Sequence, residues 1–215
     1  MTILGAIVEP GGERALAWAD TELSTRGLPS GFGNKLLVNA AASMVCVATG
    51  WGRLARAAAA VAESAASLDV AADRMPSRLR SVADAILKDG RVADPEDYGR
   101  QSVLLVGLSP EGGCIYGIRF SGTAGFSPVL FTTYASPGHV EPFDVADPAA
   151  LVATAKRQAE ELRAWRPGVI GGRLTAALIQ PGTVTTHVVY DLAANHWLLP
   201  MAAGVMPPLQ LAEAA

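Results

Sequence analysis

Short apolar runs containing β-branched residues, broken by glycine and proline, fill the first part of the chain and predict strands. Thr2 to Glu9 is the first such run, and it stops at Pro10-Gly11-Gly12, a strong turn signal. Glu13 to Asp20 continues as a second run. The chain is therefore expected to begin with a β-hairpin.

A second pair of strands is expected after a loop. Ser24 to Asn34 is rich in glycine, serine and proline, a composition typical of a loop. The strand-like runs Leu36 to Asn39 and Ser43 to Thr49 follow it. The second run leads into Gly50-Trp51-Gly52, so this pair is expected to end in a glycine turn.

Two helices are expected next, because apolar positions change to a spacing of three and four residues. Pro76 fits the first helical position of the second helix, where its missing N–H costs nothing, and Gly90 fits the position just past its end. Arg91 to Arg100 is polar and predicts an exposed connection. The first apolar stripe comprises Leu54, Ala57, Val61, Ala65 and Leu68, and the second comprises Leu79, Val82 and Ile86.

The rest of the chain returns to strands around one more helix. Asp147-Pro148 combines an N-cap with a proline at the first helical position, and predicts a helix to about Trp165. A tail of weak periodicity begins at Ala193. Ser102 to Leu108 and Cys114 to Phe120 are predicted strands joined by a turn at Ser109-Pro110-Glu111-Gly112-Gly113, and Val129 to Tyr134 is another strand. Arg173 to Gln180 and Val184 to Leu192 are expected to form a final hairpin around Pro181-Gly182.

The order of these elements predicts the fold class. Hairpins dominate, and the first two helices come as a block rather than one after each strand. A doubly wound parallel sheet alternates strand and helix, so that architecture is disfavoured. We expect an α+β protein in which stacked, mainly antiparallel sheets are covered by helices.

Composition supports a packed domain. The chain has 215 residues, of which 50% are hydrophobic and only 17% are charged. This excludes a disordered chain, which needs low hydrophobicity and high net charge. The length is most simply one domain. So little charged surface also favours a homo-oligomer that buries some of its faces.

The net charge and the N-terminal sequence argue against further classes of protein. The net charge is −3 and no Lys/Arg cluster is present, so nucleic-acid binding is not expected. The first residues lack the basic and apolar regions of a signal peptide, and Leu54 to Leu68 is too short and too interrupted to span a bilayer. A soluble, cytoplasmic protein is expected. Cys46 and Cys114 are interpreted as small buried hydrophobes without a disulfide.

Most familiar enzyme motifs are missing. Gly31-Phe32-Gly33-Asn34-Lys35-Leu36 begins like a dinucleotide loop but lacks the third glycine. His139, His187 and His196 have no Cys or paired carboxylates at metal-ligand spacing. No Gly-x-Ser-x-Gly elbow occurs. No cofactor and no metal ion are therefore expected.

The N-terminal residues include a candidate catalytic group. If Met1 is removed, Thr2 holds a hydroxyl and a free α-amine on one residue. The reference pKa of such an amine is about 7.7–8.0, close to what a general base needs at neutral pH. Nucleophile and base are then assembled without a histidine.

Asp20 and Lys35 are candidates to support that site. Asp20 ends the second predicted strand and Lys35 opens the third, so both could approach the start of the first. Two ammonium groups about 4 Å apart repel by roughly 4 kcal/mol at an effective dielectric of 20. A carboxylate at Asp20 would offset much of this repulsion, keeping Lys35 charged and the amine neutral.

These residues give the chain a resemblance to the N-terminal nucleophile hydrolases of the proteasome β-subunit and bacterial HslV family, over roughly Thr2 to Leu192. No single motif is specific, but their order and spacing are. The matching segments are Thr2-Ile3-Leu4-Gly5, Ala19-Asp20, Lys35, Val47-Ala48-Thr49-Gly50-Trp51-Gly52, Ser102-Val103-Leu104-Leu105-Val106-Gly107, Tyr134-Ala135-Ser136-Pro137-Gly138 and Gly171-Gly172.

The resemblance implies a threonine-type peptidase or amidohydrolase with a four-layer αββα sandwich over residues 1–192 and a tail over 193–215. Thr2 would be the nucleophile, Lys35 would tune it and Asp20 would orient Lys35. A backbone N–H at Thr49 or Gly50 would form the oxyanion hole, and Ser136 matches a serine near the threonine amine. It also implies a peptide or amide substrate, a ring or stacked-ring homo-oligomer and an ATP-dependent unfoldase as a candidate partner.

The chain departs from the family pattern at four places. Thr49 replaces the usual glycine, and Arg53 stands where an acid is common. Arg166 to Ile170 lacks the family's Asp and Ser, and His139 to Ala146 is too short for the usual helix. Two alternatives therefore stay open: a family-like structural or binding subunit that assembles without hydrolysis, and an unrelated protein with a similar strand order.

Overall fold

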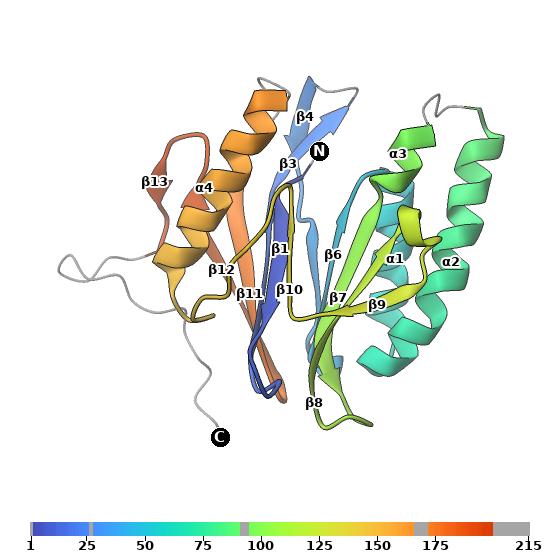
Figure 1. The fold of residues 1–215 in the computed structure, drawn as a ribbon, viewed down its shortest axis with the longest axis horizontal. Coiled ribbons are helices and arrows are strands. Elements are labelled where there is room, and N and C mark those ends of the chain that lie inside the picture. The colour runs from blue at the N-terminus through green and yellow to red at the C-terminus, as the bar shows by residue number, and fades with distance from the viewer. Residues whose placement is uncertain (1, 26–27, 91–94, 166–171, 200–215) are drawn as a thin grey trace.

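Two antiparallel sheets carry most of the chain in the computed structural model, which describes residues 2–25, 28–90, 95–165 and 172–199 (Figure 1). The protein is mixed α+β, as the element order predicted. Along the described residues, the six-stranded sheet has the order β10 (Thr133–Ser136), β1 (Leu4–Val8), β2 (Ala15–Asp20), β11 (Arg173–Gln180), β12 (Thr183–Asp191) and β13 (His196–Trp197). The five-stranded sheet has the order β5 (Leu36–Asn39), β6 (Met44–Thr49), β7 (Ser102–Ser109), β8 (Cys114–Ser121) and β9 (Pro128–Phe131).

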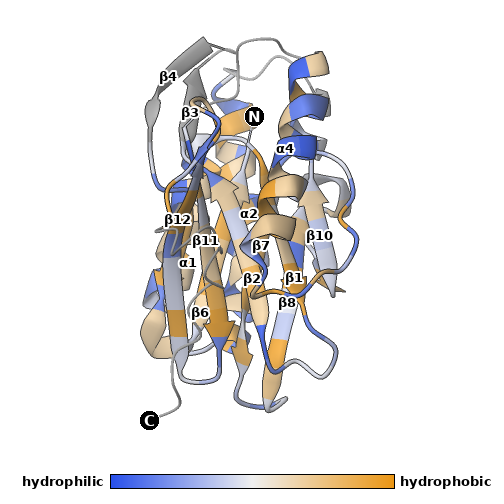
Figure 2. Ribbon diagram, turned by 90° about the vertical axis from the view of Figure 1, so that its left-hand side faces the viewer, coloured by the Kyte–Doolittle hydropathy of each residue, from blue (hydrophilic) through white to orange (hydrophobic). Residues whose placement is uncertain are grey.

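The two sheets face each other through small and branched apolar side chains. β1 and β2 are buried along their whole length, because they are covered on both faces. This explains why their sequences are nearly continuous apolar runs rather than an alternating pattern. Figure 2 shows the apolar residues concentrated along these strands. The layer between the sheets includes Leu4, Ala6, Ala17, Val45, Val47, Leu104, Val106, Ala177 and Ile179.

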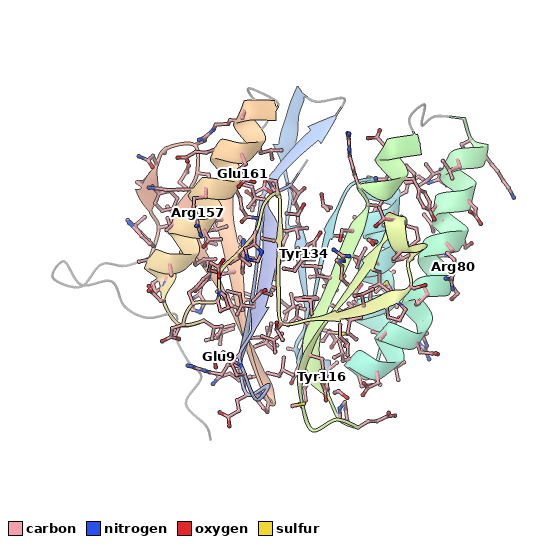
Figure 3. The ribbon with its side chains drawn as sticks, viewed as in Figure 1. Glu9, Arg80, Tyr116, Tyr134, Arg157 and Glu161 are labelled. Carbon is pink, nitrogen blue, oxygen red and sulfur yellow. The ribbon has the colours of Figure 1, made fainter. Side chains whose placement is uncertain are left out.

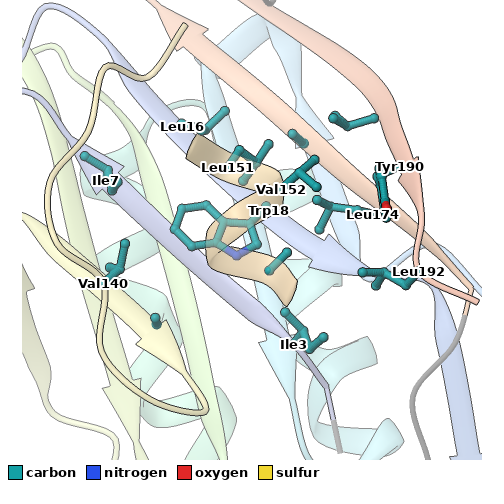
Figure 4. Close-up of a cluster of buried hydrophobic side chains, with 14 of the residues drawn as sticks. Ile3, Ile7, Leu16, Trp18, Val140, Leu151, Val152, Leu174, Tyr190 and Leu192 are labelled. Atoms are coloured by element: carbon teal, nitrogen blue, oxygen red, sulfur yellow. The ribbon is translucent and has the colours of Figure 1, made fainter. Parts of the chain in front are cut away.

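Helices cover the outer faces of both sheets (Figure 1). α1 (Gly52–Ser64) and α2 (Leu68–Lys88) pack on the five-stranded sheet through one apolar cluster. α4 (Pro148–Trp165) packs on the six-stranded sheet through another. Figure 4 shows Trp18 of β2 in the middle of this second cluster, beside Leu151 and Val152 of α4. No described helix has the length and apolar character needed to cross a membrane.

A buried glutamine joins α4 to the six-stranded sheet. Gln158 is 2% exposed, and its Oε1 accepts a hydrogen bond from Trp18 Nε1 at 2.9 Å. Its Nε2 donates to the carbonyl oxygens of Leu4 at 2.9 Å and Ser136 at 3.0 Å. One side chain thus fixes the start of β1 and the end of β10 relative to the helix.

Replacing Gln158 with leucine is expected to lower the free energy of unfolding by about 3 kcal/mol. The change leaves the buried Trp18 N–H without a partner and removes a donor from two carbonyl groups, and each unsatisfied buried group costs about 1–3 kcal/mol. Urea unfolding measures the loss. Glu160→Leu, at an exposed site on the same helix, is the matched control and is expected to change stability little. Equal stability of the two variants would refute this account of Gln158.

The four predicted hairpins β1–β2, β5–β6, β7–β8 and β11–β12 are confirmed. The predicted loop over Ser24 to Asn34 is wrong, because this region contains a small two-stranded sheet of β3 (Glu22–Thr25) and β4 (Leu28–Phe32). Their backbones pair with each other, which satisfies the polar groups despite the glycine and proline content.

The helix boundaries around Pro76 were also predicted wrongly. α1 ends at Ser64, and α2 begins at Leu68 with Ser67 as its N-cap, so Pro76 lies inside α2. Ser67 Oγ accepts a hydrogen bond from Val70 N at 3.3 Å. A proline inside a helix costs about 3 kcal/mol. The buried stripe that continues through it outweighs this cost, and comprises Leu68, Ala71, Met75, Leu79, Ala83 and Ile86.

Two further segments differ from the prediction. Within Arg91 to Arg100, residues 91–94 lie outside the described residues, and the rest is not simply a connection, because it forms α3 (Pro95–Gly99). The single strand predicted over Val129 to Tyr134 is two strands, β9 and β10, in different sheets. The chain crosses between the sheets at Thr132, whose carbonyl oxygen accepts a hydrogen bond from Val8 N at 2.7 Å.

The cysteines agree in part with their interpretation. Both are free thiols, as predicted. Cys46 is buried on β6, and burial raises the pKa of its thiol to about 12. Cys114 starts β8 and is only half-buried, so it is not the fully buried residue that was expected.

Candidate functional site

The candidate site lies at the end of the sheets where β1 begins and β2 ends. Asp20, the last residue of β2, is 2% exposed. Its Oδ1 accepts a hydrogen bond from Ile3 N at 2.9 Å, and Asp20 N donates to Ile3 O at 3.1 Å. The Asp20 side chain therefore fixes the residue that directly follows Thr2.

Lys35 reaches the same carboxylate from the chain segment just before β5. Its Nζ lies 2.9 Å from each carboxylate oxygen of Asp20, and the side chains of Lys35 and Asp20 are only 8% and 3% exposed. The ion pair joins the two sheets, because Asp20 ends a strand of one and Lys35 precedes the edge strand of the other. The predicted contact between these two residues is present.

Thr2 stands at the start of this arrangement. It is 8% exposed and is linked by one peptide bond to Ile3, whose N–H is held by Asp20. The chain direction of β1 therefore delivers the Thr2 alcohol and its backbone nitrogen to the end of the sheet where the ion pair lies. The structure brings Asp20 and Lys35 into contact, and the Asp20 carboxylate binds Ile3, the residue that follows Thr2.

Ser136 is the last residue of β10 and lies opposite Leu4 of β1, at this same end of the six-stranded sheet. It is half-buried, and its carbonyl oxygen is held by Gln158 Nε2. Tyr134, two residues earlier, faces the space between the two sheets (Figure 3). Its hydroxyl lies 3.4 Å from Ser102 Oγ, and the guanidinium of Arg119 lies 5.1 Å from its ring centre.

The turn after β6 contains the candidate oxyanion donors. Thr49 ends β6, and Gly50 has φ of +105°, a left-handed conformation that favours glycine. A Cβ on Gly50 would lie 2.0 Å from Gln101 Oε1, so there is no room for a side chain. The predicted oxyanion donors thus lie in a turn whose backbone conformation requires glycine at position 50.

Gln101 holds that turn in place. It is 2% exposed, its Oε1 accepts a hydrogen bond from Trp51 N at 2.6 Å, and its Nε2 donates to Asp97 O. Trp51 is the N-cap of α1 and has no side-chain cap of its own, so Gln101 fulfils part of that role from fifty residues away. Tyr98 of α3 packs edge-on against Trp51 and extends this support.

Sequence reasoning missed both Gln101 and Gln158. Gln158 lies on the apolar stripe of α4, between Ala155 and Leu162, and a polar residue in that position was a usable signal. Gln101 gave no comparable signal, because its partners are backbone groups, one at Asp97 four residues away and one at Trp51 fifty residues away. Of the departures noted above, Arg53 pairs with Asp89 at 2.6 Å on the surface, and Arg166 to Ile170 lies outside the described residues.

A cavity of about 750 Å³ adjoins the ion pair. Thr21, which follows Asp20, and Asn34, which precedes Lys35, both contribute to its wall. Sequence reasoning did not predict this cavity. Its other lining residues are Gly33, Leu36, Gly172, Arg173, Thr175, Ala176, Thr186, His187, Val188, Asp191 and Ala193.

The histidines do not gather, and His187 contributes to the wall of the cavity. His139 is exposed beside Glu141, at 3.3 Å between Nε2 and Oε1, and His196 is exposed on β13. His187 Nε2 is buried without a hydrogen-bond partner, and burial lowers the pKa of this imidazole. Among the described residues, no three His, Cys, Asp or Glu side chains are placed to hold a metal ion.

No protein-family model and no curated protein matches the chain. The function is therefore argued from the chemistry of the site.

Proposed function

We propose that the protein is an N-terminal threonine hydrolase that cleaves an amide bond with Thr2 as its nucleophile after removal of Met1. The observation that carries this proposal is the shielded Asp20–Lys35 ion pair, whose carboxylate also holds the N–H of Ile3. The Lys35 cation is thus bound to the same carboxylate that holds the residue following Thr2.

A gain in fold stability does not by itself explain why the protein contains a shielded ion pair of this kind. Removing two charges from water is costly, and apolar residues of similar volume often stabilise a fold as well or better. Ionisable groups placed together in a cleft are instead a common feature of catalytic sites. The carboxylate of this pair binds the residue that follows Thr2, and this is consistent with such a role.

The proposed reaction needs no cofactor. The free α-amine of Thr2 takes the proton from its own hydroxyl, and the oxygen attacks the amide carbon to form a tetrahedral oxyanion. A backbone N–H of Thr49 or Gly50 stabilises that charge, an interaction worth about 10²–10³ in rate. The amine returns the proton to the leaving nitrogen. A water molecule, activated by the same amine, then hydrolyses the ester and restores Thr2.

The arrangement of layers supports the same proposal. α4, the two stacked sheets and the α1–α2 pair follow one another in the order of the four-layer αββα sandwich of N-terminal nucleophile hydrolases (Figure 1). We further propose, from that resemblance, a homo-oligomer that confines its active sites and an ATP-dependent unfoldase as its partner.

Thr49 favours a second candidate, a structural or binding subunit of the same architecture that no longer hydrolyses. A buried β-branched side chain stands in the oxyanion turn where the family usually has glycine. This candidate retains the fold and the oligomer but loses the stabilisation of the tetrahedral intermediate.

Covalent labelling distinguishes the two candidates. A β-lactone is expected to acylate the native protein once per chain, with the adduct on Thr2 after peptide mapping. Labelling should accelerate as pH rises through the pKa of the Thr2 amine, which the Lys35 cation is expected to hold below the reference value of about 7.7–8.0, because only the neutral amine is a base. Heat-denatured protein is the control and is expected to remain unlabelled at Thr2. A native protein without an adduct at any pH supports the non-hydrolysing subunit.

A further inference from the structure

The space between the two sheets contains an arginine on the side of β8 and β10. Residues that pair across neighbouring strands share a face of the sheet, so the partner of a residue in the inter-sheet layer faces that layer too. Arg119 of β8 is paired with Leu104, and Tyr134 of β10 is paired with Ala6. Leu104 and Ala6 both belong to the inter-sheet layer. Arg119 and Tyr134 therefore meet in this space from different sheets (Figure 3).

The charge of Arg119 is not balanced by a carboxylate. The residue is half-buried, and its guanidinium carbon lies 5.1 Å from the centre of the Tyr134 ring. Across the part of the chain that the structure describes, the Arg119 side chain has no ion pair and no hydrogen bond. The ring contact holds the guanidinium in place but accepts none of its N–H groups in the way an oxygen does. An anionic ligand is the group that would use these donors.

Hydroxyl groups and apolar side chains complete the surroundings of Arg119. The Tyr134 hydroxyl lies 3.4 Å from Ser102 Oγ, a long contact that leaves both groups able to donate to a ligand. Val129, opposite Arg119 on the edge strand β9, keeps 42% of its surface exposed, and the Phe131 ring lies 6.0 Å from that of Tyr134. One guanidinium balances the single charge of a carboxylate and pairs with both of its oxygens, whereas a phosphate dianion would keep an unbalanced charge.

This group of residues lies close to the candidate oxyanion turn. Ser102 is the direct strand partner of Thr49, and neighbouring strands lie about 5 Å apart, so the Tyr134 hydroxyl lies within about 10 Å of the Thr49 backbone. Extended chain spans about 3.3–3.6 Å per residue, so about three residues cover that distance. A carboxylate bound at Arg119 would thus lie up to about three residues from the amide that is cleaved.

The proposed reaction places the leaving group on the β10 side of the site. The Thr2 amine returns its proton to the leaving nitrogen, so the leaving group must lie on the same side as the amine. The resemblance places Ser136 near that amine, and Ser136 lies two residues after Tyr134 on β10. The leaving group would therefore extend along β10 toward Tyr134 and Arg119.

From this geometry we propose that Arg119 and Tyr134 bind the free C-terminal carboxylate of the substrate, so that the protein removes up to about three residues from the end of a peptide. The proposal rests on the proposed function, because it takes Thr2 as the residue that cleaves the amide. It adds the class of substrate, a peptide with a free carboxylate close to the cleaved bond, and the two side chains that recognise it.

Three peptides test the proposal: acetylated tetra-alanine with a free carboxylate, the same peptide as a carboxamide, and a carboxamide in which glutamate replaces the last alanine. Mass spectrometry of the products gives the rates. The native protein is expected to cleave the free acid with a kcat/KM at least about tenfold above that of either carboxamide, an effect of the size that hydrogen bonds to a charged group supply.

Variants of the two binding residues show whether they cause this preference. Arg119→Gln should reduce the ratio of free acid to carboxamide to about threefold or less, and Arg119→Lys, which keeps the charge, should give an intermediate ratio. Tyr134→Phe removes the hydroxyl alone and should also lower the ratio. Arg157→Gln is the matched control, because it removes the same charge from the exposed face of α4 (Figure 3), and its ratio should equal that of the native protein.

The possible results separate this proposal from the proposed function. Equal cleavage of all three peptides, or cleavage of none, with normal β-lactone labelling at Thr2 overturns the carboxylate site alone. A preference for the free acid that persists unchanged in folded Arg119→Gln overturns it as well. If the glutamate carboxamide is cleaved as fast as the free acid, the assignment to the C-terminus is wrong. No cleavage and no adduct at Thr2 would overturn the proposed function, and the carboxylate site with it.

Discussion

Thr2→Ala is expected to lower kcat by about 10⁴-fold or more, because it removes the oxygen that attacks the substrate in the proposed mechanism and leaves the rest of the site in place. Thr2→Ser keeps the alcohol and the amine and is expected to retain measurable turnover. Thr2 precedes β1 and forms no part of its strand pairing, so the fold should persist in both variants.

Steady-state cleavage of a fluorogenic peptide amide measures these effects, with urea unfolding as the check on the fold. The alanine variant is also expected to lose the β-lactone adduct. Turnover of Thr2→Ala within a factor of ten of the native protein would show that another residue acts as nucleophile.

Lys35→Met is expected to reduce both activity and stability. The substitution leaves the Asp20 carboxylate, 2% exposed, without its cation, and breaking a buried ion pair in this way typically costs about 3–5 kcal/mol. Activity should fall by about 10²-fold or more, because the charge that supports the Thr2 amine and hydroxyl is removed. Lys35→Arg retains the charge and is expected to keep more of both properties.

A double variant separates the two effects of Lys35. Adding Asp20→Asn to Lys35→Met removes the uncompensated charge, so the free energy of unfolding should recover by about 1–3 kcal/mol while activity stays lost. Urea unfolding and amide cleavage on the four proteins of this cycle provide the measurement. Recovery of activity in the double variant would show that Lys35 has only a structural role.

Local sequence patterns predicted the elements that depend on interactions between residues close together in the sequence. The turns at Pro10-Gly11-Gly12 and Pro181-Gly182 sit between apolar runs, and both hairpins formed as expected. The same patterns gave wrong predictions where the structure depends on contacts between residues far apart in the sequence. Pro76 lies inside α2 because a long buried stripe compensates for the proline, and the composition of Ser24 to Asn34 concealed a strand pair.

The residues of the candidate site were likewise predictable only in part. Asp20 and Lys35 were predictable together, because both lie at strand ends that the element order brings to one edge. Gln101 was not, since its Oε1 accepts from the backbone N–H of Trp51, fifty residues away, which only the folded chain brings near. The cavity depends on β12 extending beyond β5, and sheet width is not readable from any local pattern.

The central claim is that a freed Thr2 amine next to the Asp20–Lys35 pair makes the adjacent alcohol a nucleophile. Intact-mass measurement of the purified protein before and after β-lactone treatment tests it most directly. The account predicts a chain that begins at Thr2 and gains one adduct, with no adduct on any population that retains Met1. A labelled chain that still carries Met1, or a chain beginning at Thr2 that gains no adduct, would contradict it.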